Sequence, residues 1–281
     1  MDVSPPIKRI LNPLDLSPFS AAATRTACAI AKQHGATVEG LVVLDFPGIT
    51  GQDVPYHAWM LPDALLQSAE RIADAKPRIS NALQQFSVTC DAAGVSHVDS
   101  THQGVPAYRI METASLHDLV VMGLRTFFHF ETSDDPGDTL AKVLHAPQTP
   151  ILAVTESCTG DWKRVLIAFD GSPAACRVLK EFSRFARPCN LDITLLTSAD
   201  DQEQGARCVE SAAAYLRAHQ FDNIKTSVSE SPILEVLDDL YLKSFDLVVA
   251  GSHSRKYLKD FFVGSVARRL IDFGQTPVFI N

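Results

Sequence analysis

Several features of common protein classes are missing from this 281-residue sequence. No apolar stretch approaches the ~20 residues that a membrane-spanning helix requires, and the N-terminus, residues 1–6, lacks the charged and apolar regions of a secretory signal. There is also no extended basic run, and the net charge is −8. This charge argues against nucleic acid or an anionic membrane as the main partner. We therefore expect a cytoplasmic protein with neither kind of partner.

Cysteine chemistry and common catalytic motifs are equally sparse. The six cysteines are scattered, and none forms a C-x-x-C pair. A chain of this length does not depend on a disulfide framework, so we expect buried, reduced thiols and no metal site. No G-x-S-x-G nucleophile elbow occurs, and no lysine follows a G-x-x-x-x-G loop. The sequence therefore does not predict an enzyme.

The sequence does contain an internal repeat, since the same landmarks occur in the same order in both halves. Each half has an apolar stretch ending in Asp, then a Ser-Pro step, then an Asp-Leu-Val-Val strand, and lastly a Gln-Thr-Pro tripeptide. The landmarks are residues 10–15, 17–18, 118–121 and 148–150 in the first half, and 165–170, 172–173, 246–249 and 275–277 in the second. The chain is about twice as long as a usual domain, so two homologous domains are expected.

The spacing of the landmarks locates an insertion in the first copy. Asp15 precedes Asp118 by 103 positions, whereas Asp170 precedes Asp246 by 76, so the first copy carries about 27 extra residues (103 − 76). Residues 46–62 are rich in Pro and Gly, which indicates a long surface loop. We expect this loop to lead into a lengthened helix.

The pattern predicts an α/β fold with two tandem doubly wound domains. Short apolar runs separated by helical patterns indicate a parallel sheet with helices on both faces, and Leu119–Val121 and Leu247–Val249 do not alternate, as expected for buried strands. Predicted strands lie near residues 7–12, 37–43, 97–102, 118–122 and 150–154, and near 163–169, 191–197, 223–228, 246–250 and 277–280. We call residues 1–155 the N-terminal repeat and 162–281 the C-terminal repeat, joined by a linker at 155–162.

In doubly wound sheets ligands bind beyond the carboxyl ends of the strands, where the strand order reverses. In the C-terminal repeat, Asp170 ends the first predicted strand and Gly251 follows the fourth. Gly264 and Ser265 would begin the last helix, whose N–H groups and dipole favour an anion. Asp170 could accept a hydrogen bond from a ribose hydroxyl or help to hold a metal that bridges phosphates. Ser172-Pro173 is also typical of a helix start, with a hydroxyl cap and Pro at the first helical position.

These motifs resemble the universal stress protein family. The resemblance rests on Asp-Gly-Ser after the first strand, the Asp-Leu-Val-Val-x-Gly strand and the terminal Thr-Pro-Val strand, and it covers nearly the whole chain twice. It implies five-stranded parallel sheets of order 3-2-1-4-5, with the fifth strands as the pairing edge between the domains. It also implies ATP bound at a G-x-x-G-x9-G-(S/T) motif, and the carboxylate of Asp170 makes Mg²⁺ a possible second cofactor. Carried onto this sequence, the motif gives Gly251, Ser254, Gly264 and Ser265, with Asp170 as the family's aspartate and Ser198 near the adenine. The neighbouring residues Gly171, Ser172, His253, Arg255 and Val266 complete the predicted cofactor-binding set, although His253 could equally be a solvent-facing loop residue.

The motif departs from the family pattern in both repeats. Ser254 replaces the second glycine, which costs roughly 1–2 kcal/mol if the site requires a left-handed backbone, and each ~1.4 kcal/mol is a factor of ten in affinity. In the N-terminal repeat the equivalents are Gly123, Thr126 and Gly137-Asp138, with ten intervening residues in place of nine. Asp138 places a carboxylate where a hydroxyl would meet phosphate. The N-terminal repeat is therefore not expected to bind nucleotide.

Three functions are compatible with these sequence features. The first is a stress-response or regulatory protein that binds ATP or a related adenine nucleotide in the C-terminal repeat and does not turn it over. The second is a dimerisation or interaction scaffold without nucleotide, and the third is a slow ATPase. The two fifth strands are expected to pair within the chain, because an exposed sheet edge needs cover. A homodimer of the tandem is a further possibility.

Overall fold

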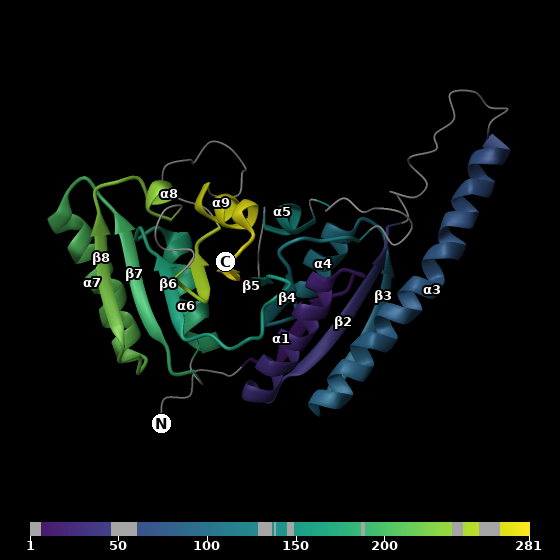
Figure 1. Cartoon of the computed structure of the whole chain (residues 1–281), viewed down its shortest axis with the longest axis horizontal. Helices are drawn as coiled ribbons and strands as arrows, with labels where there is room; N and C mark the ends of the chain where they lie inside the picture. Colours follow the sequence, from purple (N-terminus) through teal and green to yellow (C-terminus); the bar gives the residue numbers. More distant parts are fainter. Residues whose placement is uncertain are drawn as a thin grey trace.

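The computed structural model describes residues 7–45, 61–128, 137, 139–144, 149–186, 189–237, 244–252 and 265–281, with the side chains of 61–65 excepted. Over these ranges the strands form one ten-stranded sheet of order β3-β2-β1-β4-β5-β10-β9-β6-β7-β8 (Figure 1). The predicted α/β fold is confirmed.

The elements follow the predicted order in both repeats. Those of the N-terminal repeat are β1 (Arg9–Pro13), α1 (Pro18–His34), β2 (Thr37–Leu44), α3 (Leu61–Ala93), β3 (His97–Gln103), α4 (Pro106–Ala114), β4 (Leu119–Gly123), α5 (Thr139–Leu144) and β5 (Ile151–Val154). Those of the C-terminal repeat are β6 (Arg164–Ala168), α6 (Pro173–Ala186), β7 (Asp192–Ser198), α7 (Gln202–Ala218), β8 (Ile224–Ser229), α8 (Ile233–Val236), β9 (Leu247–Ala250), α9 (Ser265–Phe273) and β10 (Val278–Ile280).

Each repeat contributes five parallel strands in the order implied by the resemblance, with β6–β10 corresponding to β1–β5. The two sets meet where β10 pairs antiparallel with β5, with Phe279 opposite Leu152. The pairing predicted between the fifth strands is therefore present within the chain. His34 of α1 adds a contact outside the sheet, since its Nε2 lies 3.0 Å from the carbonyl oxygen of Phe185 in α6.

Helices cover both faces of the sheet, and each face has its own core. Buried residues of α1, α3, α6 and α7 pack on one face, while those of α4, α5 and α9 pack on the other. The strands between them carry mainly Val, Ile and Leu, because parallel strands covered on both sides are shielded from water throughout.

The helix α3 accounts for much of the extra length of the N-terminal repeat. It has 33 residues, against 17 in its counterpart α7, and it runs past the end of the sheet (Figure 1). The lengthened helix is as predicted, although Pro77 stands inside it. The loop predicted at 46–62 lies outside the described residues up to residue 60.

The repeated aspartate before the fourth strand has a structural role. Asp118 Oδ2 accepts hydrogen bonds from the backbone N–H groups of Lys8 and Arg9, at 2.8 and 3.0 Å. Asp246 Oδ2 does the same for Lys163 and Arg164, at 3.1 and 2.9 Å. Each aspartate thus ties the start of the fourth strand to the start of the first.

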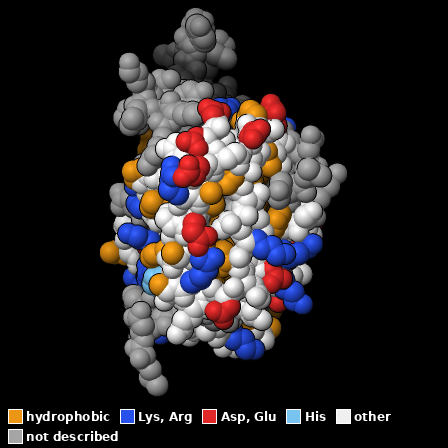
Figure 2. Space-filling model, turned by 90° about the vertical axis from the view of Figure 1, so that its left-hand side faces the viewer, with side chains coloured by type: hydrophobic (Ala, Val, Ile, Leu, Met, Phe, Trp, Pro, Cys, Tyr) orange, Lys and Arg blue, Asp and Glu red, His pale blue; other side chains and the backbone are white. Residues whose placement is uncertain are grey.

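The surface at the β8 end of the sheet carries both signs of charge. Figure 2 shows Lys and Arg side chains interspersed there with Asp and Glu, and with scattered apolar groups between them. On α7, Arg207 bonds Glu203 at 2.7 Å and Arg217 bonds Glu210. Over the described part of the chain, no helix is long and apolar enough to cross a membrane.

Candidate functional site

The strand order reverses between β6 and β9 in the C-terminal repeat. These strands are hydrogen-bonded neighbours, with Ile167 opposite Val249, and the chain leaves β6 toward β7 and leaves β9 toward β10 on the other side. Asp170 and Gly251 therefore follow the carboxyl ends of adjacent strands, where open α/β sheets place their ligands. The sequence predicted that these two residues follow the ends of neighbouring strands, and the structure places them there.

The turn after β6 presents a carboxylate beside a helix start. Gly171 takes a left-handed backbone, with φ +69°, and Ser172 N–H donates to Asp170 Oδ1 at 2.9 Å. Ser172 Oγ accepts from Ala175 N–H at 3.1 Å, so this hydroxyl caps α6 as predicted. The Asp170 side chain is exposed, whereas Ser172 is buried. One carboxylate oxygen of Asp170 is thus held by the Ser172 N–H, while the side chain remains exposed to solvent.

Gly251 lies against the first turn of α6. A Cβ at this position would be 3.0 Å from the carbonyl carbon of Ala174 and 3.0 Å from the nitrogen of Ala175. A glycine is therefore needed for β9 to end beside this helix start. The contact leaves the N-terminus of α6 adjacent to the end of β9.

Of the other predicted ligand-binding residues, the structure describes three, at the ends of β7 and α9. Ser265 begins α9 and is exposed, as predicted for a residue at the start of the last helix, and Val266 is half-buried beside it. Ser198 ends β7 and is exposed, and its hydroxyl donates to the carbonyl of Ser231 at 2.8 Å. Four predicted residues lie outside the described residues: His253, Ser254, Arg255 and Gly264.

In the N-terminal repeat, the corresponding space between the turn after β1 and the loop after β4 is closed by the protein itself. Asp15 is buried and accepts hydrogen bonds from the backbone N–H groups of Ser17, at 2.8 Å, and Phe127, at 2.7 Å. Burial raises the pKa of Asp15, against the lowering effect of these hydrogen bonds. The backbone N–H of Gly137 donates to the carbonyl of Thr126 at 2.7 Å. The aspartate and the glycine amide that would face a nucleotide are therefore both engaged by this repeat's own backbone.

Phe19, at the start of α1, also packs closely against the end of β4 in the N-terminal repeat. Phe19 occupies the position that Ala174 has in the C-terminal repeat, and its Cβ would lie 2.6 Å from a Cβ on Gly123. The loop after β4 is thus packed against α1.

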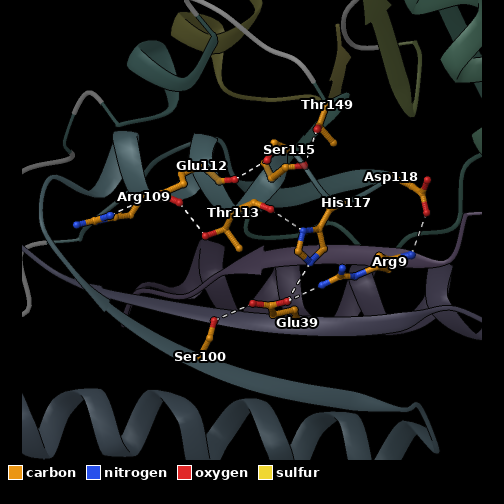
Figure 3. A network of polar contacts seen from close by, with 11 residues as sticks. Arg9, Glu39, Ser100, Arg109, Glu112, Thr113, Ser115, His117, Asp118 and Thr149 are labelled. Atoms are coloured by element: carbon orange, nitrogen blue, oxygen red, sulfur yellow. Dashed lines mark hydrogen bonds and ion pairs between the residues drawn. The ribbon is translucent and has the colours of Figure 1, made fainter.

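A second polar cluster lies at the opposite ends of the strands in the N-terminal repeat (Figure 3). Glu39 of β2 lies at its centre and contacts His117 Nε2 at 3.1 Å, Arg9 at 3.2 Å and Ser100 Oγ at 2.9 Å. His117 Nδ1 lies 2.8 Å from the carbonyl of Thr113. These groups satisfy one another, so the cluster joins β1, β2, β3 and β4 and needs no ligand. Within the described ranges, no three His, Cys, Asp or Glu side chains are grouped to hold a metal.

Comparison with models of protein families identifies the family of this chain. Residues 6–154, more than half of the chain, match the model of the universal stress protein family. The chain belongs to this family. The resemblance inferred from the motifs is therefore confirmed, and the match falls on the repeat whose crevice is closed. Comparison with curated protein sequences finds no significant match.

Two solved structures share the fold over nearly the whole chain. A universal stress protein from Archaeoglobus fulgidus DSM 4304 is 17% identical with TM-score 0.69, covering 97% of each chain. A functionally unknown protein from Pseudomonas aeruginosa PAO1 is 13% identical with TM-score 0.64, covering 98% of this chain and 92% of that one. A universal stress protein solved in complex with cAMP is 19% identical and covers 43% of this chain and 96% of that one, with TM-score 0.38.

The contrast between the two universal stress repeats rests on residues that motif reasoning did not weigh. In the turn after the first strand, Leu16 stands where the C-terminal repeat has Gly171. Gln220 is the one non-glycine residue of the described ranges with a positive φ, so Leu16 does not take the backbone of Gly171. The signal available in the sequence was this Gly-to-Leu difference, since a left-handed leucine would cost roughly 1–2 kcal/mol.

Proposed function

We propose that the C-terminal repeat binds an adenine nucleotide, ATP or a close relative, beyond the carboxyl ends of β6 and β9. The proposal rests mainly on one observation, the difference between the two equivalent aspartates. Asp170 is exposed at the switch point, whereas Asp15 is buried and bonded to the loop after β4. A carboxylate in solvent beside the start of α6 can meet a ligand, whereas a buried carboxylate whose two oxygens both accept hydrogen bonds cannot.

The surroundings of Asp170 fit the chemistry of a nucleotide. The N-termini of α6 and α9 supply backbone N–H groups and positive dipole ends, which favour phosphate oxygens. The exposed Ser265 hydroxyl can donate to a phosphate. Asp170 can accept from a ribose hydroxyl or hold a Mg²⁺ bridging two phosphates, since carboxylate oxygens suit this cation. The end of β7, at Ser198, lies on the side where the base would extend.

The proposed role is regulatory binding in the cytoplasm rather than turnover. Neither a Walker lysine nor a nucleophile elbow is present in the sequence. A bound nucleotide would instead change which surface the tandem offers to a partner in a stress response, whether it acts as a single chain or as a homodimer.

A scaffold without nucleotide is the second candidate, and one observation favours it. The close packing of Gly251 on α6 explains this glycine without any ligand. The same contact would be needed in a protein whose purpose is to present a ten-stranded sheet. The two functions therefore differ in whether ATP stabilises the native state.

A thermal-shift titration with ATP and Mg²⁺ separates the two functions. A ligand at about 100 times its Kd stabilises the native state by ~2.7 kcal/mol, so the unfolding midpoint of the wild type should rise with nucleotide concentration. Asp170→Ala should remove most of this rise. It should lower the midpoint without ligand less than Asp15→Ala does, because Asp170 is exposed and accepts one N–H, that of Ser172.

Asp15→Ala is the matched control in the other repeat. It should lower the midpoint without ligand, because it leaves the backbone N–H groups of Ser17 and Phe127 without their buried acceptor. Its response to nucleotide should match that of the wild type. A wild type whose midpoint does not move at millimolar ATP would leave the scaffold as the function.

A further inference from the structure

Two cysteines far apart in the sequence meet between α1 and α3. Cys28 of α1 and Cys90 of α3 are 62 positions apart, and their Sγ atoms lie 3.5 Å from each other. Both side chains are buried, with 3% and 0% of their surface exposed. A disulfide has an S–S distance of about 2.05 Å, so the sulfur atoms need to approach by only about 1.5 Å. The two helices lie in direct contact, and Figure 1 shows them on the same side of the sheet.

The contact makes the two thiols chemically unequal. The hydrogen bond from Cys90 lowers the pKa of the Cys28 thiol, because it stabilises the Cys28 thiolate, and burial opposes this effect only in part. The same contact and burial raise the pKa of Cys90. Since the thiolate is the reactive form of cysteine, Cys28 is the member of the pair suited to attack an oxidant.

A surface groove of about 750 Å³ lies between α1 and α3, beside the turn that contains Asp15. The cysteines do not line it, but its lining includes Thr24, one turn before Cys28, and Thr89, next to Cys90. A small neutral oxidant such as a hydroperoxide therefore has a path to within one helical turn of the thiols.

The C-terminal repeat has a different pair at the matching place. Ser183 follows Ser172 by eleven positions, as Cys28 follows Ser17. Ser183 Oγ lies 3.5 Å from the hydroxyl of Tyr215 on α7. This contact joins the equivalent helices but cannot form a covalent cross-link, so the chemistry available to the thiols is confined to the N-terminal repeat.

We propose that Cys28 and Cys90 form a reversible disulfide when the protein meets a hydroperoxide. The Cys28 thiolate attacks one oxygen of the peroxide, the O–O bond breaks, and the departing oxygen leaves as water or alcohol. The Cys90 sulfur then attacks the sulfenic sulfur of Cys28, the S–S bond forms, and hydroxide leaves with the Cys90 proton as water. Two thiols are oxidised by two electrons and one peroxide is reduced. The disulfide joins α3, the lengthened helix of the N-terminal repeat, to α1, which follows the turn of Asp15.

Peptide mapping after peroxide treatment tests the proposal on the full chain. The protein is exposed to hydrogen peroxide, quenched with catalase, denatured, alkylated at its thiols and digested with trypsin. Four of the six cysteines should take up the reagent (6 − 2 = 4). Cys28 and Cys90 are the only cysteines of the tryptic peptides 26–32 and 79–109, so these two peptides should appear joined. Dithiothreitol should separate them.

Two variants give the controls. Cys28→Ser should abolish the joined peptides, while Cys158→Ser should keep them, because Cys158 is also buried but contacts the Thr26 hydroxyl. The wild-type map decides the matter even if a variant fails to fold. Uptake of six alkyl groups after peroxide would overturn the proposal, as would either thiol appearing as sulfinic acid or joined to another cysteine.

Discussion

At the scale of single residues, equivalent aspartates are buried in one repeat and exposed in the other. Asp15 and Asp170 follow equivalent strands and precede equivalent Ser-Pro steps. Leu16 in one turn and Gly171 in the other give the two backbones different conformations. One carboxylate turns inward to the Phe127 amide, and the other stays in solvent. A single glycine thus distinguishes a structural aspartate from a ligand-binding candidate.

The burial of Asp15 predicts a pH dependence of stability. Its pKa in the folded protein is raised above the ordinary value of 3.8, with burial as the largest cause. Its stabilising contribution is therefore fully present below pH 3.8 and is lost as the pH rises through the folded pKa. We therefore expect the unfolding free energy of the wild type to fall relative to that of Asp15→Asn as the pH rises above 3.8. Urea denaturation at a series of pH values measures this difference.

Asp246→Asn provides a control of opposite sign. The hydrogen bond from Arg164 lowers the pKa of Asp246 below 3.8, so its contribution is present above that pH and is lost as the pH falls. Because this pair is partly exposed, its effect should be small. If both variants changed in the same direction with pH, the assignment of Asp15 as the buried partner of the Phe127 amide would be wrong.

At the scale of secondary-structure elements, close packing of strand ends on helix starts holds each switch point. A Cβ on Gly251 would lie 3.0 Å from backbone atoms of α6, and one on Gly123 would lie 2.6 Å from the Arg125 carbonyl oxygen and from Phe19 Cβ. Overpacking of this kind costs about 1–3 kcal/mol. We predict that Gly251→Ala and Gly123→Ala both lower the unfolding free energy, and that Gly123→Ala lowers it more.

Chemical denaturation followed by circular dichroism measures both values. The ranking follows from the shorter distances at Gly123, where the obstacles are the Arg125 carbonyl oxygen and the Phe19 Cβ. A Gly251→Ala variant that lost more stability than Gly123→Ala would contradict the packing described for the two loops.

The elements were largely predictable from the sequence, for a physical reason. Strands buried on both faces consist of short Val, Ile and Leu runs, so the predicted and observed limits differ by only one or two residues, as at 37–43 against Thr37–Leu44. The insertion was also predictable, because it changes the spacing between Asp15 and Asp118. The division of the chain at 155–162 stays a prediction.

Contacts between distant elements were not predictable. The bond from Phe127 to Asp15 spans 112 positions, and the thiol contact spans 62. Both depend on how a loop or a helix is turned about its own axis, which hydrophobic periodicity does not specify. The expectation of buried thiols holds for Cys28, Cys90 and Cys158, whereas Cys176, Cys189 and Cys208 are half-buried. It gave no sign that Cys28 and Cys90 meet.

At the scale of the whole molecule, two unequal repeats share one sheet. The β5–β10 pairing covers the edge that each repeat would otherwise expose. Around that joint, the N-terminal repeat has a closed crevice and a buried thiol pair, while the C-terminal repeat has an exposed Asp170. This asymmetry predicts that the tandem has a single nucleotide site, although its fold offers two switch points.

Isothermal titration calorimetry with ATP and Mg²⁺ tests this asymmetry most directly, because it counts sites. We predict one nucleotide per chain for the wild type and for Asp15→Ala, and no detectable binding for Asp170→Ala. Two nucleotides per chain, or one that persists in Asp170→Ala, would contradict the asymmetry.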